Sequence, residues 1–303
     1  MKRAVITGPT GAVGVALVNQ LVKENVEVLA VCRKGSKRIG NIPKDSLVQV
    51  LELNLDELDK LPKMAEGTYD VFYHLGWDGT FGNSRNNMDG QLKNIEYTLA
   101  AVKAAKALDC DAFVGAGSQA EYGRVEGKLN AGTPPFPENG YGIAKLCAGQ
   151  MSRILCEQYE MRHIWLRILS VYGPYDGANT MVMSVMRALM DGNKPKLTKG
   201  EQQWDYLYSK DAAKAIYLLG DKGKHGKIYC IGSGKTRPLI EYVEAIRNEV
   251  NPKGELQVGA VPYAPKQVMY LCADIEDLQK DTGFEPEYTF EEGIHETHEW
   301  MQQ

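Results

Sequence analysis

Short apolar runs alternate with helical patterns through the first half of the chain. The runs cover residues 3–7, 27–32, 48–51, 71–75, 112–115 and 163–169. Most of them are nearly continuous apolar segments, which is typical of parallel strands buried on both faces of a sheet. The clearest helical patterns between them cover residues 84–108 and 141–159. This alternation predicts an α/β fold built on a doubly wound parallel sheet.

The pattern loosens after residue 170, where a turn-forming cluster runs from Tyr172 to Gly177. We expect helices over 178–190 and 211–219, and a strand over 228–231 that rejoins the sheet. Pro238 stands at the first position of a helix expected over 239–250, where proline is tolerated. The chain is therefore expected to form a sheet domain over 1–170, completed by 206–232, and a smaller C-terminal lobe from 171–205 and 233–303.

The composition excludes several classes of protein. With 44% hydrophobic residues and a net charge of −4, 303 residues can bury a large core, and they lack the positive charge of a nucleic-acid-binding domain. No run of apolar residues is long enough to suggest a membrane span. The six cysteines form no C-x-x-C pair, which favours reduced thiols in a cytoplasmic protein. The 31 glycines exceed an average composition, so we expect them in turns or close backbone approaches.

A glycine-rich turn joins the first predicted strand to the first helix. Its pattern, G-x-x-G-x-x-G, is a variant of the dinucleotide fingerprint in the strand–turn–helix context that supports such a motif. The first glycine permits a tight turn, the second lets the backbone approach a pyrophosphate, and the third lets the helix pack on the strand. We therefore predict a Rossmann-type dinucleotide-binding domain, with cofactor contacts at Thr7, Gly8, Thr10, Gly11, Ala12, Val13 and Gly14.

The end of the second predicted strand indicates which dinucleotide is bound. In NAD enzymes an Asp or Glu about 20 residues after the turn binds the ribose 2′-hydroxyl. In this chain Cys32 is followed by Arg33 and Lys34 instead. Because an arginine can pair bidentately with a 2′-phosphate, the sequence favours NADP(H) over NAD(H), with Arg33 and Lys34 as contacts.

Tyr141 and Lys145 form a Y-x-x-x-K pair at the start of a predicted helix. This spacing puts the phenol and the ammonium on one helix face, where the cation lowers the tyrosine pKa and suits the phenol to proton transfer. Tyr206 and Lys210 have the same spacing, so the position of each pair in the predicted fold must show which one is catalytic. Ser118 ends the fifth strand, one loop before Tyr141, where open α/β sheets bind ligands. We predict Ser118, Tyr141 and Lys145 as the catalytic group, and Tyr206 as structural.

The chain resembles the extended short-chain dehydrogenases/reductases, the NAD(P)-dependent epimerase/dehydratase family that acts mainly on nucleotide sugars. The resemblance spans nearly the whole length and includes the glycine turn, the motifs around Ser118 and Tyr141, and the segment from Arg167 to Pro174. It implies that Ser118 hydrogen-bonds the substrate carbonyl, that Tyr141 is the acid/base, and that Lys145 binds the nicotinamide ribose. It also implies cofactor contacts at Tyr141, Asn54, Leu55, His74, Leu75, Gly76 and Asn94.

Departures from the family pattern narrow the reaction. Sugar 4,6-dehydratases carry Asp-Glu where this chain has Gln119 and Ala120, and GDP-fucose synthases carry a cysteine base at the position of Ala120. The reaction that remains is simple hydride transfer. Arg33 and the segment around Trp204 favour one such enzyme, an NADPH-dependent reductase of a nucleotide-linked 4-keto-6-deoxy sugar. The alternative is a nucleotide-sugar 4-epimerase with tightly bound NAD. A third, non-catalytic NADP-sensing role is disfavoured because Tyr141 and Lys145 are both present.

The resemblance also implies a sugar pocket and a partner. Candidate substrate contacts are Trp77, Thr80, Arg85, Gln119, Ser170 and Trp204. For the segment from Trp77 to Arg85, which follows the fourth strand, the alternative is a surface loop with one packed tryptophan. Trp204 and Ala264 replace arginines that commonly meet the nucleotide phosphates, and the basic residues available in their place are Lys266, Arg187 and Arg85. The resemblance implies a homodimer that pairs helices 84–108 and 141–159 of two copies. His295 and His298 lack further converging ligands, so we expect a solvated helix and no metal.

Overall fold

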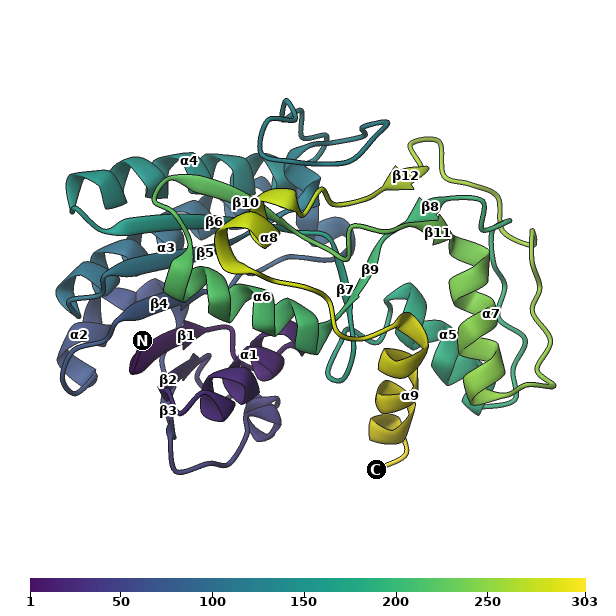
Figure 1. The fold of residues 1–303 in the computed structure, drawn as a ribbon, viewed down its shortest axis with the longest axis horizontal. Coiled ribbons are helices and arrows are strands. Elements are labelled where there is room, and N and C mark those ends of the chain that lie inside the picture. The colour runs from purple at the N-terminus through teal and green to yellow at the C-terminus, as the bar shows by residue number, and fades with distance from the viewer.

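A seven-stranded parallel sheet forms the centre of the molecule, in a computed structural model that describes residues 1–303 (Figure 1). The strands lie in the order β10-β6-β5-β4-β1-β2-β3, which reverses direction between β1 and β4. Their bounds are β1 (Arg3–Thr7), β2 (Glu27–Cys32), β3 (Val48–Glu52), β4 (Val71–His74), β5 (Ala112–Ser118), β6 (Arg162–Ile168) and β10 (Lys227–Ile231). The prediction of a doubly wound parallel sheet is confirmed, and its point of reversal is where such sheets bind ligands.

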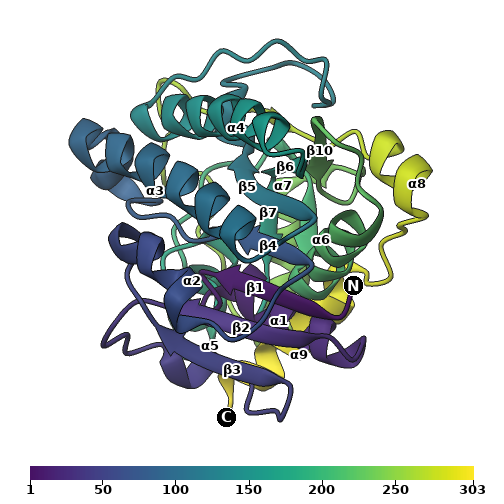
Figure 2. The same ribbon diagram turned by 90° about the vertical axis from the view of Figure 1, so that its left-hand side faces the viewer.

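Helices cover both faces of the sheet (Figure 2). One face carries α1 (Ala12–Lys23) and α6 (Ser209–Lys222), and the other carries α3 (Met88–Ala107) and α4 (Gly140–Gln158), with the short α2 (Leu61–Met64). Side chains alternate along β1: Ala4 and Ile6 belong to the core beneath α1 and α6, whereas Val5 belongs to the core beneath α3 and α4. This two-sided burial explains why the strands are continuous apolar runs. No helix has both the length and the apolar character needed to cross a bilayer.

A smaller lobe lies beyond one end of the sheet (Figure 1). It contains α5 (Met181–Met190), α7 (Leu239–Val250) and α9 (Phe290–Met301), together with short strands β8 (Gln203–Trp204), β11 (Arg237–Pro238) and β12 (Tyr270–Leu271). The paired strands β7 (Ser170–Tyr172) and β9 (Tyr206–Tyr208) connect it to the sheet, and α8 (Glu276–Thr282) returns to pack on α6. Its separate apolar core includes Tyr172, Met186, Tyr242, Ile246 and Phe290.

Several predicted boundaries differ from those in the structure. The helix expected from residue 84 begins at Met88, because 3-10 turns cover Gly82–Asn86 and the Asn87 side chain accepts a hydrogen bond from the Gly90 N–H as an N-cap. The helix expected from residue 178 begins at Met181. Pro238 is the N-cap of α7, and as part of β11 it pairs with Gln203 of β8. Its predicted place inside the first turn of the helix was therefore wrong. The fifth strand ends at Ser118, as predicted, and so extends beyond the apolar run 112–115.

Candidate active site

A cavity of about 490 Å³ opens at the carboxyl ends of β1, β2 and β4. Six of the predicted cofactor residues line it: Gly8, Thr10, Arg33, Asn54, Leu55 and Gly76. The cavity therefore lies where the strand order reverses, the position at which doubly wound sheets hold dinucleotides.

The glycine turn has the shape that a pyrophosphate requires. Gly8 has a positive φ of 74°, and a Cβ there would lie 2.8 Å from the Gly76 nitrogen. A Cβ on Gly14 would overlap the Gly8 carbonyl oxygen, so only glycine lets α1 pack this closely on the turn. A Cβ on Gly11 would meet nothing within 4 Å, so the backbone there is open to a ligand. Ala12 and Val13 start α1, whose N-terminus adds a favourable dipole for phosphate. The residues present thus fit a dinucleotide.

Four of the predicted cofactor residues lie behind the cavity wall and do not line it. The Thr7 hydroxyl lies 2.9 Å from His74 Nδ1 and accepts a hydrogen bond from the Gly76 N–H at 3.2 Å, which ties β1 to β4. Burial and the charge of Lys145 lower the His74 pKa to about 3, so this imidazole is neutral at physiological pH. Asn94 in α3 is also buried, and its amide bonds both the N–H and the carbonyl of Asp78. Leu75 packs against the core beneath α1.

Basic side chains surround the outer end of the cavity. Arg33, Ser36 and Arg38 line it, and Arg38 also donates to the Tyr175 carbonyl at 2.9 Å. Lys34 does not line it, because its ammonium pairs with Glu57 at 2.7 Å. Ser36 and Arg38, which line the cavity, lie further along the same loop, and the cofactor contact at Lys34 stays a prediction.

Ser118 and Tyr141 come together from β5 and α4. Ser118 caps a 3-10 turn, Gln119–Glu121, in which the Ala120 N–H donates to Ser118 Oγ at 3.2 Å. Asn139 caps α4 and starts the helix just before Tyr141. Burial raises the Tyr141 pKa, and a hydrogen bond with Ser118 and the charge of Arg85 partly oppose this rise. The lowered pKa predicted from the Y-x-x-x-K spacing was therefore wrong, because burial outweighs the nearby positive charges. The Arg85 guanidinium carbon lies 4.7 Å from the centre of the Tyr141 ring.

Lys145 is buried one turn after Tyr141, with 3% of its surface exposed. Its ammonium donates to the Ala116 carbonyl at 2.6 Å and lies 3.6 Å from the centre of the Trp77 ring. Burial lowers the Lys145 pKa to about 7, while the charge of Glu121 acts in the opposite direction. A serine, a tyrosine and a lysine of altered basicity thus meet beside the dinucleotide cavity, an arrangement suited to proton transfer at a carbonyl.

The comparison with known protein families agrees with this geometry. Residues 4–232 match the model of the NAD dependent epimerase/dehydratase family. The chain belongs to this family.

Relatives of this family member carry out different reactions on nucleotide sugars, as their names state. It is 28% identical to a dTDP-glucose 4,6-dehydratase of Xanthomonas campestris pv. campestris, over 68% of this chain and 65% of the dehydratase, slightly less than two thirds of that relative. It is 23% identical to a CDP-abequose synthase of Salmonella muenchen, over 97% of this chain and 96% of the synthase. A solved UDP-N-acetylglucosamine 4-epimerase from Methanobrevibacter ruminantium M1 shares the fold at a TM-score of 0.89, with 22% identity over 99% of this chain and 98% of the epimerase.

A buried ion pair beneath Ser118 was missed from the sequence. Glu121 and Arg167 are both almost fully buried, and the Arg167 Nε lies 2.7 Å from Glu121 Oε2. Glu121 also accepts hydrogen bonds from the Ser118 N–H at 2.8 Å and from Trp165 Nε1 at 3.0 Å. Ser118 and Glu121 form a capping box, so the S-x-x-E spacing was the available signal. The pair fixes the turn that carries Ser118.

The predicted sugar-pocket residues do not form one group. Arg85 and Trp77 contact Tyr141 and Lys145, and Gln119 follows Ser118 directly. Ser170 and Trp204 bond to each other, because Trp204 Nε1 donates to Ser170 Oγ at 2.8 Å. Thr80 lines a separate cavity of about 310 Å³. Arg187, Ala264 and Lys266 are exposed and line neither this cavity nor the dinucleotide cavity.

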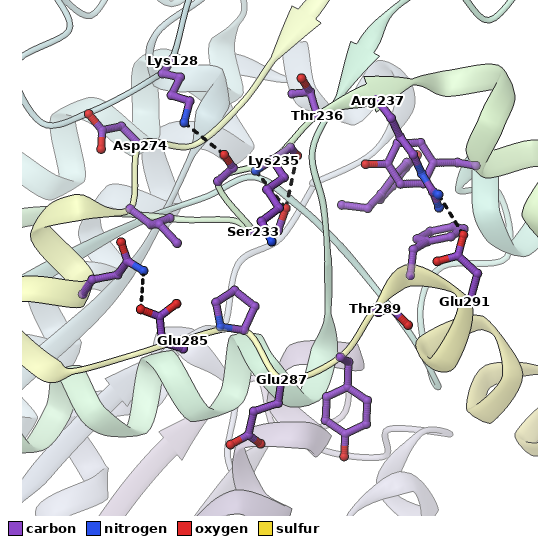
Figure 3. A pocket seen from close by; sticks show the side chains of 18 of the residues that line it. Lys128, Ser233, Lys235, Thr236, Arg237, Asp274, Glu285, Glu287, Thr289 and Glu291 are labelled. Carbon is purple, nitrogen blue, oxygen red and sulfur yellow. Dashed lines mark hydrogen bonds and ion pairs between the residues drawn. The ribbon is translucent and has the colours of Figure 1, made fainter.

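A larger cavity, of about 810 Å³, is lined by none of the predicted catalytic residues; Figure 3 shows the side chains that line it. It is lined mainly by the segments 233–237 and 285–291, where the chain crosses between the sheet and the lobe, and neither Tyr141 nor Lys145 reaches it. One ion pair joins two of its charged lining residues, Arg237 and Glu291, at 2.8 Å. Trp77, whose ring packs on the Lys145 ammonium, lines the smaller cavity at the ends of β1, β2 and β4 and does not line this larger one.

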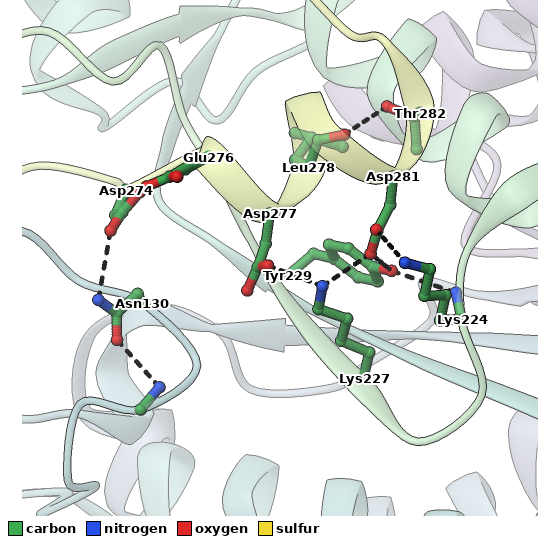
Figure 4. Close-up of polar contacts among 11 residues, drawn as sticks. Asn130, Lys224, Lys227, Tyr229, Asp274, Glu276, Asp277, Leu278, Asp281 and Thr282 are labelled. Carbon is green, nitrogen blue, oxygen red and sulfur yellow. Dashed lines mark hydrogen bonds and ion pairs between the residues drawn. The ribbon is translucent and has the colours of Figure 1, made fainter.

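A cluster of charged side chains joins α8 to the edge strand β10 of the sheet (Figure 4). Asp281 of α8 accepts hydrogen bonds from Lys227 at 2.7 Å and from the Tyr229 hydroxyl at 2.8 Å, and it also pairs with Lys224. Bonds from these lysines hold the Asp281 pKa well below its usual range. The cluster is structural, because it fixes α8 against the edge strand β10.

Proposed function

We propose that this protein is an NADPH-dependent reductase of the 4-keto group of a nucleotide-linked 4-keto-6-deoxy sugar. The observation that carries the proposal is the basic rim of the dinucleotide cavity. Arg33 and Arg38 line its outer end, where NAD enzymes of this fold place a carboxylate for the ribose 2′-hydroxyl. Recognition of a cofactor by its 2′-phosphate suits a reductase that consumes NADPH. A 4-epimerase, in contrast, retains and recycles NAD.

The side chains present support a proton-donating role for Tyr141. Because burial raises its pKa, the phenol is protonated at neutral pH and can donate to a carbonyl oxygen that gains charge. Ser118 Oγ can hold the same oxygen, and the Lys145 ammonium can hold a ribose hydroxyl and stabilise the phenolate left on Tyr141. NADPH, when bound, supplies the hydride. The protein thus supplies the proton, the orientation and the charge stabilisation.

Two residues argue against other reactions of the family. Elimination of water needs an acid and a base after the position of Ser118, and this chain has an amide at Gln119 and a methyl group at Ala120. Neither group can transfer a proton. Epimerisation at C3 or C5 needs a base at the position of Ala120, which is also missing. Hydride transfer with proton donation by Tyr141 therefore remains as the supported chemistry.

The substrate class and the partner are part of the same proposal. The names of the relatives support a nucleotide sugar, since they describe activities on dTDP-, CDP- and UDP-linked sugars. An apolar surface on α3 and α4 supports a homodimer: these exposed side chains are Leu92, Ile143, Met151 and Ile154. Light scattering of the eluted protein tests the dimer, and a monomeric mass would contradict it.

The decisive experiment follows NADPH absorbance with a panel of nucleotide-linked 4-keto-6-deoxy sugars. We expect one NADPH oxidised per sugar reduced, and a higher kcat/KM with NADPH than with NADH. Interconversion of 4-epimeric sugars without net NADPH oxidation would overturn the reductase and identify an epimerase.

A pair of neighbouring variants tests the basic rim. Arg33→Ala should lower kcat/KM for NADPH by about 10- to 100-fold and leave that for NADH nearly unchanged, since a charge-assisted hydrogen bond is lost. Lys34→Ala is the matched control, because it removes an adjacent positive charge that pairs with Glu57 outside the cavity. Equal losses in both variants would mean that general charge, and not a 2′-phosphate contact, acts here.

A further inference from the structure

The Trp77 ring packs directly against the buried ammonium of Lys145. It follows Gly76 at the end of β4, and its ring centre lies 3.6 Å from the Lys145 ammonium. The ring also stands edge-on to Tyr141, at an interplanar angle of 85° and a centroid distance of 6.1 Å. One indole therefore packs against both members of the Y-x-x-x-K pair.

Hydrogen bonds from α3 fix the orientation of this indole. Trp77 Nε1 donates to Gln91 Oε1 at 3.0 Å, and Gln91 is 2% exposed. Gln91 Nε2 in turn donates to the Gly79 carbonyl at 3.0 Å and to the Ser84 carbonyl at 3.1 Å. The loop after β4, the helix α3 and the indole are thus joined, so that Trp77 holds its face toward Lys145.

The Lys145 ammonium has few other partners. It has lost nearly all of its hydration and makes one hydrogen bond within the protein, to the Ala116 carbonyl. A desolvated ammonium over an indole face is stabilised by the ring quadrupole, and Trp is the strongest partner for this interaction. Since the Lys145 pKa is lowered to about 7, a modest change in this stabilisation changes the fraction of charged lysine at neutral pH.

Trp77 also lines the dinucleotide cavity, beside Gly8, Asn54 and Gly76. The residue therefore lies between the proposed cofactor site and the lysine that serves it. We propose that Trp77 is a positioning residue that holds the Lys145 ammonium charged and in place for the dinucleotide and for Tyr141. This inference rests on the proposed function for the reaction, but the contact with Lys145 is independent of which sugar is used.

The other charged and titratable groups near Lys145 do not duplicate this role. Glu121, from the turn after β5, favours the charged lysine, but its carboxylate is bonded to Arg167, Trp165 and the Ser118 N–H. His74, from β4, is held neutral by its low pKa of about 3. Tyr141 lies on the same helix, with its ring centre 5.7 Å from the ammonium, and Arg85 packs on that ring with its guanidinium carbon 4.7 Å from the ring centre.

The test measures the dissociation constant of NADPH between pH 6 and pH 9 by calorimetry, without a sugar. In the wild type, binding should weaken as Lys145 loses its proton. Trp77→Leu should move this transition to lower pH by about one unit, and Trp77→Phe by less, since a phenyl ring retains part of the cation–π interaction. Gln91→Leu should shift it in the same direction, because the indole loses its anchor. The alkaline limb of the kcat profile should move by the same amounts.

Trp300→Phe serves as the control, because Trp300 packs on Tyr175 in the other lobe. It should leave the pH transition unchanged, and circular dichroism melts establish that each variant is folded. An unshifted transition in folded Trp77→Leu would overturn the role of Trp77. If the transition shifts but no 4-keto sugar is reduced, the proposed reaction fails and the role of Trp77 stands. If a 4-keto sugar is reduced but the transition does not shift, the reaction stands and the role of Trp77 fails.

Discussion

Replacing Lys145 should remove activity and also make the fold more stable at low pH. The ammonium is 3% exposed, and its pKa is lowered from 10.5 to about 7, chiefly by burial. Each pKa unit corresponds to about 1.4 kcal/mol, so burying this charge costs the native state roughly 4 to 5 kcal/mol below pH 7. Lys145→Met keeps a similar unbranched side chain and removes the charge.

The sign of the pH dependence follows from the direction of the shift. Below pH 7 the lysine is protonated in both states, and the full cost is present. Between pH 7 and pH 10.5 the native lysine loses its proton while the unfolded lysine keeps it, so the free energy of unfolding of the wild type rises with pH. Relative to Lys145→Met, the wild type should therefore gain about 2 to 3 kcal/mol between pH 6 and pH 9.

Urea unfolding at pH 6 and pH 9, followed by tryptophan fluorescence, measures this difference. Lys103→Met is the matched control, since Lys103 lies exposed on α3 and its replacement should shift stability equally at both pH values. If the difference between wild type and Lys145→Met is the same at pH 6 and pH 9, the lysine is not the depressed base inferred from its burial.

Three further substitutions test the site. Tyr141→Phe should lower kcat by about 10²-fold or more through loss of the proton donor; near-normal turnover would remove Tyr141 from the chemistry. Glu121→Gln should lower the free energy of unfolding by about 3 kcal/mol, because Arg167 is left buried without its counterion. The control Glu157→Gln, in an exposed pair, should change the free energy of unfolding by under about 0.5 kcal/mol. Equal effects of the two variants would refute the burial argument. Gly14→Ala should weaken NADPH binding about tenfold or more, because the methyl group overlaps the Gly8 carbonyl, and Gly40→Ala, in open space, should not; unaltered binding in Gly14→Ala would contradict the geometry.

The dinucleotide cavity could be predicted because its determinants are local in sequence. A buried strand, a glycine turn and a helix occupy residues 3–23 without a break, so the periodicity and the glycines together specify the structure. The positions of the later strands along the chain followed from apolar runs of the length and continuity expected for a parallel sheet. Ser118 was identified because it lies at the carboxyl end of the fifth predicted strand.

Features that depend on distant residues could not be predicted. Arg33 and Lys34 are equivalent in the sequence, and only the pairing of Lys34 with Glu57, 23 residues later, removes it from the cavity. For Trp77 the sequence left a sugar pocket and a packed tryptophan open, because no local pattern shows that the indole packs on a lysine 68 positions away. The late start of α3 depends on a single cap at Asn87. In each case one specific contact outweighed the local pattern.

The bond between Thr7 and His74 has a consequence for how the chain folds. These side chains meet across β1 and β4 although 67 positions separate them along the chain, and β2, β3 and the helices α1 and α2 lie between them. Closing so large a loop costs entropy before any contact can repay it, so parallel pairing of this kind forms slowly. Helical structure should therefore return early during refolding, whereas the capacity to bind a dinucleotide should return only when the two central strands have joined.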